Sequence, residues 1–227
     1  MNKIISVAID GPAAAGKSTV AKKVAQILGF TYIDTGAMYR AFTNAVIKKG
    51  LDPKNEALSC SLIPELDIEL KEDGRVLCNN EDVTSVIREP LVSGNVSYIA
   101  SYKAIRLALV DLQRKMASKK SVVMDGRDIG TYVLPNADVK IYQIASVETR
   151  AVRRYEENLQ KGIKTTLEEV AEDVRKRDYI DSHREFAPLK PAPDSVLIDT
   201  SFMSVGEAVD SVLKVIHDKT GVEIPCH

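Results

Sequence analysis

The sequence predicts an α/β protein: a doubly wound, mainly parallel five-stranded sheet with helices on both faces and a small inserted antiparallel sheet. Short apolar runs alternate with segments of helical periodicity along most of the chain, which is the pattern of a parallel sheet covered on both faces. The 227 residues suffice for one well-buried domain with an insert. A composition of 44% hydrophobic and 28% charged residues is that of a globular protein rather than a disordered chain.

The first fifty residues alternate between strands and helices. We expect a strand at 4–9, a glycine loop at 11–18, a helix at 17–28, a short strand at 31–33 and a second helix at 37–49. Val20, Val24 and Leu28 recur at the spacing of one helix face. Gly29 and Gly50 follow the two helices and are typical stop signals.

The middle of the chain departs from this alternation. Strands at 66–70 and 76–78 flank the charged turn 71–75 and predict a small hairpin, with a third strand at 83–86. Two helices are expected after it, at 91–100 and 103–118. We interpret residues 62–97 as an inserted subdomain of a single domain, whose core comprises about residues 1–61 and 98–227.

Regular alternation resumes after the insert. We expect strands at 121–124, 139–145 and 196–198, and helices at 147–161, 167–181 and 205–219. Ligands of such sheets bind beyond the carboxyl ends of the strands. The loops that follow the strands therefore carry the candidate functional residues.

The strongest functional signal is a glycine-rich loop between the first strand and the first helix. It fits G-x-x-x-x-G-K-[ST], and its residues are Gly11, Pro12, Ala13, Ala14, Ala15, Gly16, Lys17, Ser18 and Thr19. Glycines and small residues let consecutive backbone N–H groups point at a di- or triphosphate, and the following helix adds the positive end of its dipole. Lys17 can reach the β- and γ-phosphates, and the Ser18 hydroxyl can ligate Mg²⁺. The motif in this context predicts a P-loop fold that binds ATP or GTP with Mg²⁺.

A second metal-binding group is expected at the end of a neighbouring strand. Asp125 directly follows the apolar run 122–124. Aspartate also follows strands as an ordinary turn residue. Beside a P-loop, we interpret Asp125 as the carboxylate that holds the magnesium ion through water.

The distribution of arginine separates a kinase from other P-loop proteins such as GTPase switches and motors. Six of the twelve arginines lie between positions 150 and 184: Arg150, Arg153, Arg154, Arg175, Arg177 and Arg184. Phosphoryl transfer between two anionic substrates needs such positive charge. Single members have a simpler explanation as solvated helix surface, for example Arg153 near Glu157. The set as a whole predicts a kinase.

Three further segments are specific in this order and with these neighbours. They are Asp34-Thr35-Gly36-Ala37-Met38-Tyr39-Arg40, Gly126-Arg127-Asp128 and Arg177-Asp178-Tyr179-Ile180-Asp181-Ser182-His183-Arg184. Together with the P-loop and the insert they make the chain resemble the bacterial cytidylate kinases over essentially its whole length. The resemblance implies a transferase of pyrimidine nucleotide metabolism that moves the γ-phosphate of ATP to CMP or dCMP.

The resemblance also implies roles for individual residues. It implies contacts to the acceptor phosphate by Thr35, Arg40, Arg127 and Arg184, to cytosine by Ser97, Arg106 and Asp128, and to the ribose by Arg177 and Asp181. The expected catalytic set, which positions the substrates and neutralises charge with Mg²⁺, is Lys17, Arg127, Arg150, Arg154 and Arg184.

Asp128 offers a physical basis for the choice of base. Its carboxylate can accept a hydrogen bond from the amino group of cytosine, whereas uracil presents a carbonyl there and leaves the carboxylate unpaired. An unpaired buried polar group costs about 1–3 kcal/mol, enough for roughly ten- to hundredfold discrimination. The preference between CMP and dCMP and the tolerance of UMP stay open.

The predicted chemistry needs no strong general base, because the acceptor's phosphate oxygen is already ionised at neutral pH. We therefore interpret His183, which falls in what we expect to be an arginine-rich loop, as a bystander. Residues 150–164, with a break at Gly162, are expected to form a lid. Its closure would exclude water and prevent wasteful hydrolysis of ATP.

Composition disfavours several other classes of protein. A net charge of −1 and 5% aromatic residues argue against binding of nucleic acid polymers. The apolar run 4–9 is too short for a signal peptide or a membrane span, and Cys60, Cys78 and Cys226 indicate free thiols in a reducing compartment. We expect a cytoplasmic monomer without a membrane partner. The alternatives are a kinase for another monophosphate such as UMP and a non-catalytic ATP-sensing protein.

Overall fold

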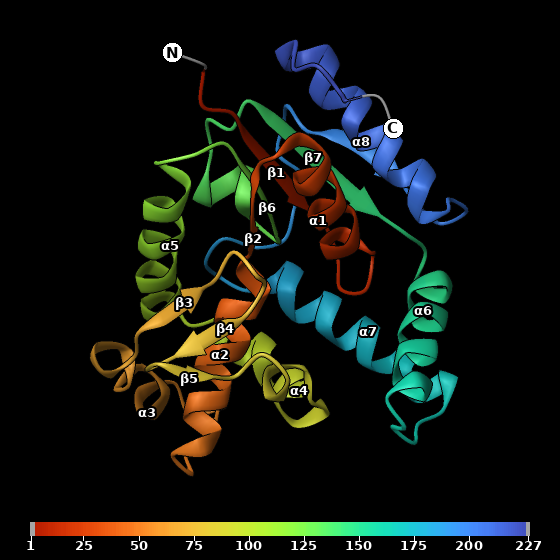
Figure 1. Ribbon diagram of the computed structural model, residues 1–227. Helices are drawn as coiled ribbons and strands as arrows, with labels where there is room; N and C mark the ends of the chain where they lie inside the picture. The colour runs from red at the N-terminus through yellow and green to blue at the C-terminus, as the bar shows by residue number, and fades with distance from the viewer. Residues whose placement is uncertain (1–2, 226–227) are drawn as a thin grey trace.

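The central sheet consists of five parallel strands in the order β2-β6-β1-β7-β8 (Figure 1). The computed structural model describes residues 3–225. The strands are β1 (Ser6–Asp10), β2 (Thr31–Asp34), β6 (Val122–Gly126), β7 (Val139–Ile144) and β8 (Val196–Asp199). Because β1 pairs with both β6 and β7, the loop that follows β1 opens at the centre of the sheet's carboxyl edge. The predicted fold class is confirmed.

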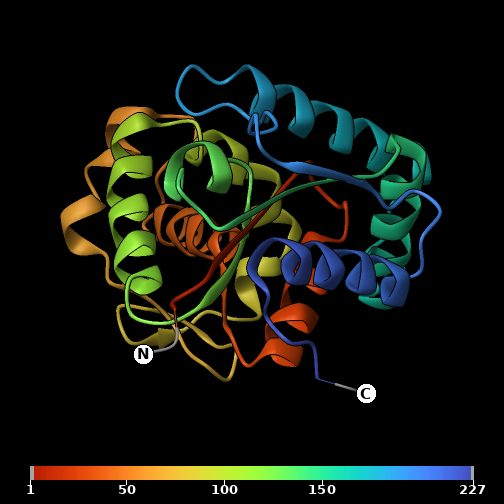
Figure 2. The ribbon, with the colours of Figure 1, turned by 90° about the horizontal axis from the view of Figure 1, so that it is seen from above.

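Helices cover both faces of this sheet. Val7 and Ile9 of β1 point into a core formed with two helices on one face, whereas Ala8 points into a core with two other elements on the opposite face. This is the two-residue alternation of a strand that is buried on both sides. Figure 2 shows α5 and α8 on opposite sides of β1. The covering elements are α1 (Lys17–Leu28) and α8 (Val205–Thr220) on one face, and α5 (Lys103–Ala117) and the π-helix η3 (Ile129–Val133) on the other.

The four other long helices surround the carboxyl edge of the sheet. They are α2 (Thr35–Lys48), α4 (Pro90–Ile99), α6 (Val147–Gln160) and α7 (Leu167–His183). All predicted helices and core strands begin and end within two residues of the observed ones. The pattern missed the short elements α3 (Glu56–Cys60), η1 (Ile63–Glu65), η2 (Val86–Arg88) and η3. They are too short to display a helical period.

The antiparallel sheet of the insert packs against α2, below the main sheet in Figure 1. Its strands are β3 (Ile68–Leu70), β4 (Val76–Cys78) and β5 (Glu81–Asp82), in that order. The prediction of a third strand at 83–86 is wrong. Asn79 and Asn80 both have positive φ and reverse the chain in a two-residue turn, so that Glu81 already pairs with Cys78. Val83 instead enters the core, at 3% exposure.

The cysteines and the helix lengths add two details. Cys60 is half-buried and Cys78 is buried, and both are free thiols. Cys226 and the last residue of the tail lie outside the described residues. Between residues 3 and 225, none of the helices combines the length and the apolar composition that crossing a membrane would require.

Candidate active site

The loop between β1 and α1 curls tightly at the carboxyl end of the central strand. Gly11 has a φ of +152°, and a Cβ atom at this position would lie 1.9 Å from the carbonyl oxygen of Gln143. Ala14 and Gly16 follow with φ values of +58° and +85°. The side-chain amide of Gln143 donates a hydrogen bond to the Ala15 carbonyl over 2.6 Å. The amino-terminal end of α1, with its unpaired N–H groups, thereby lines a cavity suited to phosphate.

Lys17 lies at the start of α1 and is only 5% exposed. Its Nζ donates a hydrogen bond to the Pro12 carbonyl over 2.7 Å. Burial and the neighbouring Arg127 lower the pKa of Lys17 to about 7, although Asp125 and Asp10 counteract them. An anion that enters the loop would favour the charged form of this buried lysine.

Ser18 and Asp125 come together from α1 and β6. The Ser18 hydroxyl donates to Asp125 Oδ2 over 2.7 Å, and the Tyr32 hydroxyl donates to Oδ1 over 2.8 Å. Burial and the nearby Asp34 raise the pKa of Asp125, while Lys17 lowers it. Residues 3–225 contain no group of three acidic, histidine or cysteine side chains that could hold a metal ion. One hydroxyl and one carboxylate suit Mg²⁺, which keeps most of its water shell and binds phosphate oxygens.

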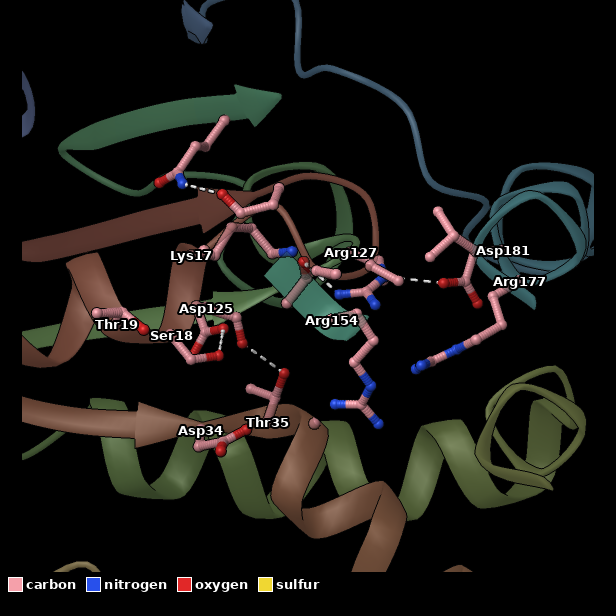
Figure 3. Close-up of a pocket in the computed structure, with 18 of the residues that line it drawn as sticks. Lys17, Ser18, Thr19, Asp34, Thr35, Asp125, Arg127, Arg154, Arg177 and Asp181 are labelled. Atoms are coloured by element: carbon pink, nitrogen blue, oxygen red, sulfur yellow. Dashed lines mark hydrogen bonds and ion pairs between the residues drawn. The ribbon is translucent and has the colours of Figure 1, made fainter. Parts of the chain in front are cut away.

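One cavity of about 680 Å³ joins the glycine loop to the arginine cluster. Figure 3 shows Lys17, Arg127, Arg154 and Arg177 extending from different elements into this space. The predicted site residues that line it are residues 13–19, Thr35, Arg40, Ser97, Arg106, Asp125, Arg127, Asp128, Arg154, Arg177, Asp181 and Arg184. Gly11, Pro12 and Arg150 do not line it.

Two buried acids organise the arginines at the far end of the cavity. Asp181 of α7 accepts a hydrogen bond from Arg127 Nε over 2.8 Å. Burial opposes its ionisation, but Arg127, Arg184 and Arg177 lower the pKa of Asp181 below its usual range. Burial and Arg127 also lower the pKa of Arg177, whose Nε has no hydrogen-bond partner. This end of the cavity thus holds more positive than negative side chains, as an anionic ligand requires.

Asp128 forms the second acidic centre. It pairs with Arg106 of α5 and lies 3.4 Å from Nη2 of Arg184. Arg106 is 1% exposed and its guanidinium lies 5.3 Å from the centre of the Tyr39 ring. Ser97 of α4 is buried and lines the same region. A carboxylate has about four acceptor positions, so Asp128 retains capacity for a further donor.

Thr35 and Arg40 lie at the start of α2. The Thr35 hydroxyl donates to the backbone carbonyl of Asp125 over 2.7 Å, which joins α2 to the end of β6. Arg40 forms an ion pair with Asp34 at 3.0 Å, and Arg88 of the insert approaches Asp34 at 3.8 Å. Arg40 and Arg88 thereby bring two more cations to the cavity.

A sequence model of one family, described as cytidylate kinase, matches residues 7–218. The chain belongs to the cytidylate kinase family. Proteins named cytidylate kinase from Oceanobacillus iheyensis and Bacillus subtilis are 52% and 48% identical to it, over 95% and 97% of this chain and 95% and 100% of theirs. The predicted family is therefore confirmed.

Solved structures extend the likeness of the fold. An uncharacterised protein from Eubacterium ventriosum is similar with a TM-score of 0.53 at 16% identity, covering 95% of this chain and 99% of its own. A gluconokinase from Sinorhizobium meliloti is similar with a TM-score of 0.50 at 13% identity, covering 94% and 92%. At these identities the likeness concerns the fold alone.

Arg150 and Arg154, predicted together as catalytic in the cytidylate kinase pattern, lie in different environments. Arg150 is buried, donates to the carbonyls of Ala145 and Ala13 over 2.9 and 3.0 Å, and pairs with Asp178 at 2.7 Å. It ties α6 to the glycine loop and to α7 from outside the cavity. Arg154 lines the cavity and pairs with Glu157 at 3.0 Å.

Two simpler expectations about this region need correction. Arg153 does not pair with Glu157 as helix surface; its guanidinium donates to the backbone carbonyl of Thr200 over 2.7 Å. His183 does not lie in a loop, because α7 continues through it. Its ring stacks on Tyr179 with 4.1 Å between ring centres, and it does not line the cavity.

The sequence pattern missed the other end of the cavity, beyond the glycine loop. It is lined there by residues of β7, α6, the β8–α8 loop and the start of α8: Gln143, Arg153, Thr200, Met203, Ser204 and Val205. One signal was available, because Thr200 follows a parallel strand at the carboxyl edge of the sheet. Nothing in the local sequence indicated that β8 lies two strands from β1, within reach of the glycine loop.

Proposed function

We propose that the chain transfers the γ-phosphate of ATP to CMP or dCMP, which yields ADP and CDP or dCDP. The observation that supports this proposal most strongly is one cavity. It joins the glycine loop, which is suited to a triphosphate, to a cationic end that contains Asp128. The cytidylate kinases identified above supply the substrate class. Other monophosphate kinases and ATP sensors lack support from these relatives.

In the proposed reaction an oxygen of the acceptor's phosphate attacks the γ-phosphorus of ATP, and the bond to the ADP oxygen breaks. The attacking oxygen is ionised at neutral pH and needs no general base. Lys17, Arg127 and Arg184 neutralise the charge on the transferred group, and Arg154 joins them as the predicted lid at 150–164 closes. Ser18, and Asp125 through water, would hold Mg²⁺, which would supply positive charge against the donor's phosphates.

The acceptor's groups are assigned by the chemistry of the cavity. Thr35 and Arg40 are proposed to bind its phosphate, and Asp181 and Arg177 its ribose. Asp128, flanked by Ser97 and Arg106, is proposed to accept from the cytosine amino group. Uracil would place a carbonyl against this carboxylate, and the loss of one hydrogen bond to a charged group costs about 1.5–3 kcal/mol.

The test is an assay of ADP release with ATP and Mg²⁺ against CMP, dCMP, UMP, AMP, GMP and no acceptor. Strong turnover with CMP and dCMP, weak turnover with UMP and none with the others is expected. Turnover that is independent of the acceptor, or absent with CMP, would refute the proposed acceptor and leave only nucleotide binding.

We also propose that one chain is the acting unit, because the glycine loop and the residues assigned to the acceptor line one cavity within this chain. Light scattering after gel filtration should give a mass near 24.9 kDa. A dimer whose dissociation abolished turnover would contradict this. The cytoplasmic location and the lack of membrane and nucleic acid partners stay predictions.

A further inference from the structure

Asp10, the last residue of β1, makes an unusual pair of contacts with the chain more than a hundred residues further on. Its carboxylate is buried, at 4% exposure, and lines none of the cavity. Oδ1 accepts a hydrogen bond from the backbone N–H of Ile129 and Oδ2 accepts one from the N–H of Gly130, each over 2.7 Å. The two carboxylate oxygens thus accept hydrogen bonds from two consecutive backbone N–H groups.

These two N–H groups begin the π-helix η3 and have no partner within it. The residues directly before them are Arg127 and Asp128, and both line the cavity. An anionic carboxylate at the start of a helix satisfies such N–H groups and interacts favourably with the helix dipole. The position of Asp128 and Arg127 therefore depends on where Asp10 holds the start of η3.

Strand pairing holds the backbone of Asp10 in place. Asp10 pairs with Gly126 of β6 on one side and with Tyr142 of β7 on the other, so its backbone lies at the centre of the sheet. Gly11, the first residue of the glycine loop, follows it directly. One side chain thus connects the start of the loop that binds the donor to the segment that binds the acceptor.

We propose that Asp10 is a positioning residue, which holds Arg127 and Asp128 in register with the glycine loop. The inference rests on the proposed function, since it concerns alignment of the same two substrates. Displacement of reacting groups by even about 1 Å can cost a hundredfold in rate. Loss of the anchor should therefore reduce acceptor use and base selectivity more than it weakens ATP binding, because β1 pairing keeps the glycine loop in place.

The decisive variant is Asp10→Asn, because asparagine has the same shape but only one acceptor oxygen and would turn an N–H donor toward a backbone N–H. Burial raises the pKa of Asp10 to about 7 against the pull of the two N–H bonds, so the assays are run at pH 8, where the carboxylate is ionised. We expect kcat/KM for CMP and the ratio of kcat/KM for CMP over UMP each to fall about tenfold to a hundredfold. The KM for ATP should change less than about threefold.

Asp138→Asn is a matched control at the opposite end of β1. Asp138 accepts hydrogen bonds from the N–H and the hydroxyl of Ser6, over 3.0 and 3.1 Å, and also ties β1 to the start of β7. It does not line the cavity. This variant should lower Tm while CMP turnover and the CMP over UMP ratio stay within about twofold of wild type.

The outcomes distinguish failure of the positioning role of Asp10 from failure of the proposed kinase function. If wild type forms no CDP, the proposed function fails. If wild type is active but Asp10→Asn keeps full selectivity, or Asp138→Asn loses selectivity equally, the positioning role is refuted. If Asp10→Asn does not fold, Asp10→Ser tests the same link, because its shorter side chain removes the carboxylate that bonds Ile129 and Gly130 without turning an N–H donor toward them. A reduced CMP over UMP ratio supports the link, and an unchanged ratio overturns it.

Discussion

The hydroxyl of Ser18 donates a hydrogen bond to the carboxylate of Asp125, 107 residues further along the chain, over 2.7 Å. Ser18 lies in the first turn of α1 and Asp125 near the end of β6, and the parallel pairing of β1 with β6 brings them together. This contact joins the glycine loop to the acid that sequence reasoning assigned to the metal. Both residues line the cavity.

Ser18→Ala should raise the Mg²⁺ concentration needed for half-maximal turnover and lower kcat by about tenfold or more, because one hydroxyl ligand is lost. Ser18→Thr keeps the hydroxyl and is the matched control, expected to stay within about threefold of wild type. The measurement is a Mg²⁺ titration of ADP release. Equal Mg²⁺ dependence of the two variants would contradict the role of the hydroxyl.

Asp128→Asn should reduce the preference for CMP over UMP by about ten- to a hundredfold, because the amide can donate to the uracil carbonyl. The variant should also unfold at a lower temperature, since Arg106 and Arg184 lose the negative charge between them. Steady-state kinetics with both acceptors and a thermal melt measure the two effects. An unchanged preference for CMP over UMP in a folded variant would show that Asp128 does not determine the choice of base.

Lys17 should couple ATP binding to proton uptake. Its pKa in the free protein is lowered to about 7 by burial and by Arg127, so at pH 8 most molecules hold a neutral amine. Bound phosphates favour the charged form and raise this pKa again, so binding should take up about one proton at pH 8, and ATP affinity should fall as pH rises above 7. Calorimetry in buffers of different ionisation enthalpy counts the protons. Lys17→Met should bind ATP more weakly with no uptake; uptake equal to wild type would exclude Lys17 as the source.

Arg150→Ala and Arg154→Ala should have opposite profiles although the two residues lie one helical turn apart. Removal of Arg150 leaves Asp178 and two carbonyls without their donor, and should lower the free energy of unfolding by about 2–3 kcal/mol. The pair of Arg154 with Glu157 is partly exposed and contributes less than about 1 kcal/mol, but Arg154→Ala should lower kcat about tenfold or more. Urea unfolding and steady-state kinetics on both variants test this difference. An Arg150→Ala variant that is stable but inactive would show that Arg150 acts in catalysis rather than in stability.

The limits of sequence reasoning are visible in particular elements. The apolar runs and stop signals located the core strands and long helices within two residues. Both are local signals, because hydrophobic periodicity and a glycine stop depend only on residues that are close in the sequence. The third strand of the insert was misplaced because a two-residue Asn turn, rather than the apolar run after it, set the register. Arg150 and Arg154 could not be distinguished, since both sit on one face of the same predicted helix.

The sequence by itself determined the fold class, the glycine loop and the family, because these reside in local patterns and in the order of short motifs. The tertiary structure alone decided which distant side chains meet: Asp10 with the start of η3, Arg153 with Thr200, and Ser18 with Asp125. Those contacts depend on the strand order β2-β6-β1-β7-β8. The physical reason is that neighbouring strands of a parallel sheet are separated in sequence by whole helices, so their pairing is chosen by burial of both faces rather than by any local signal.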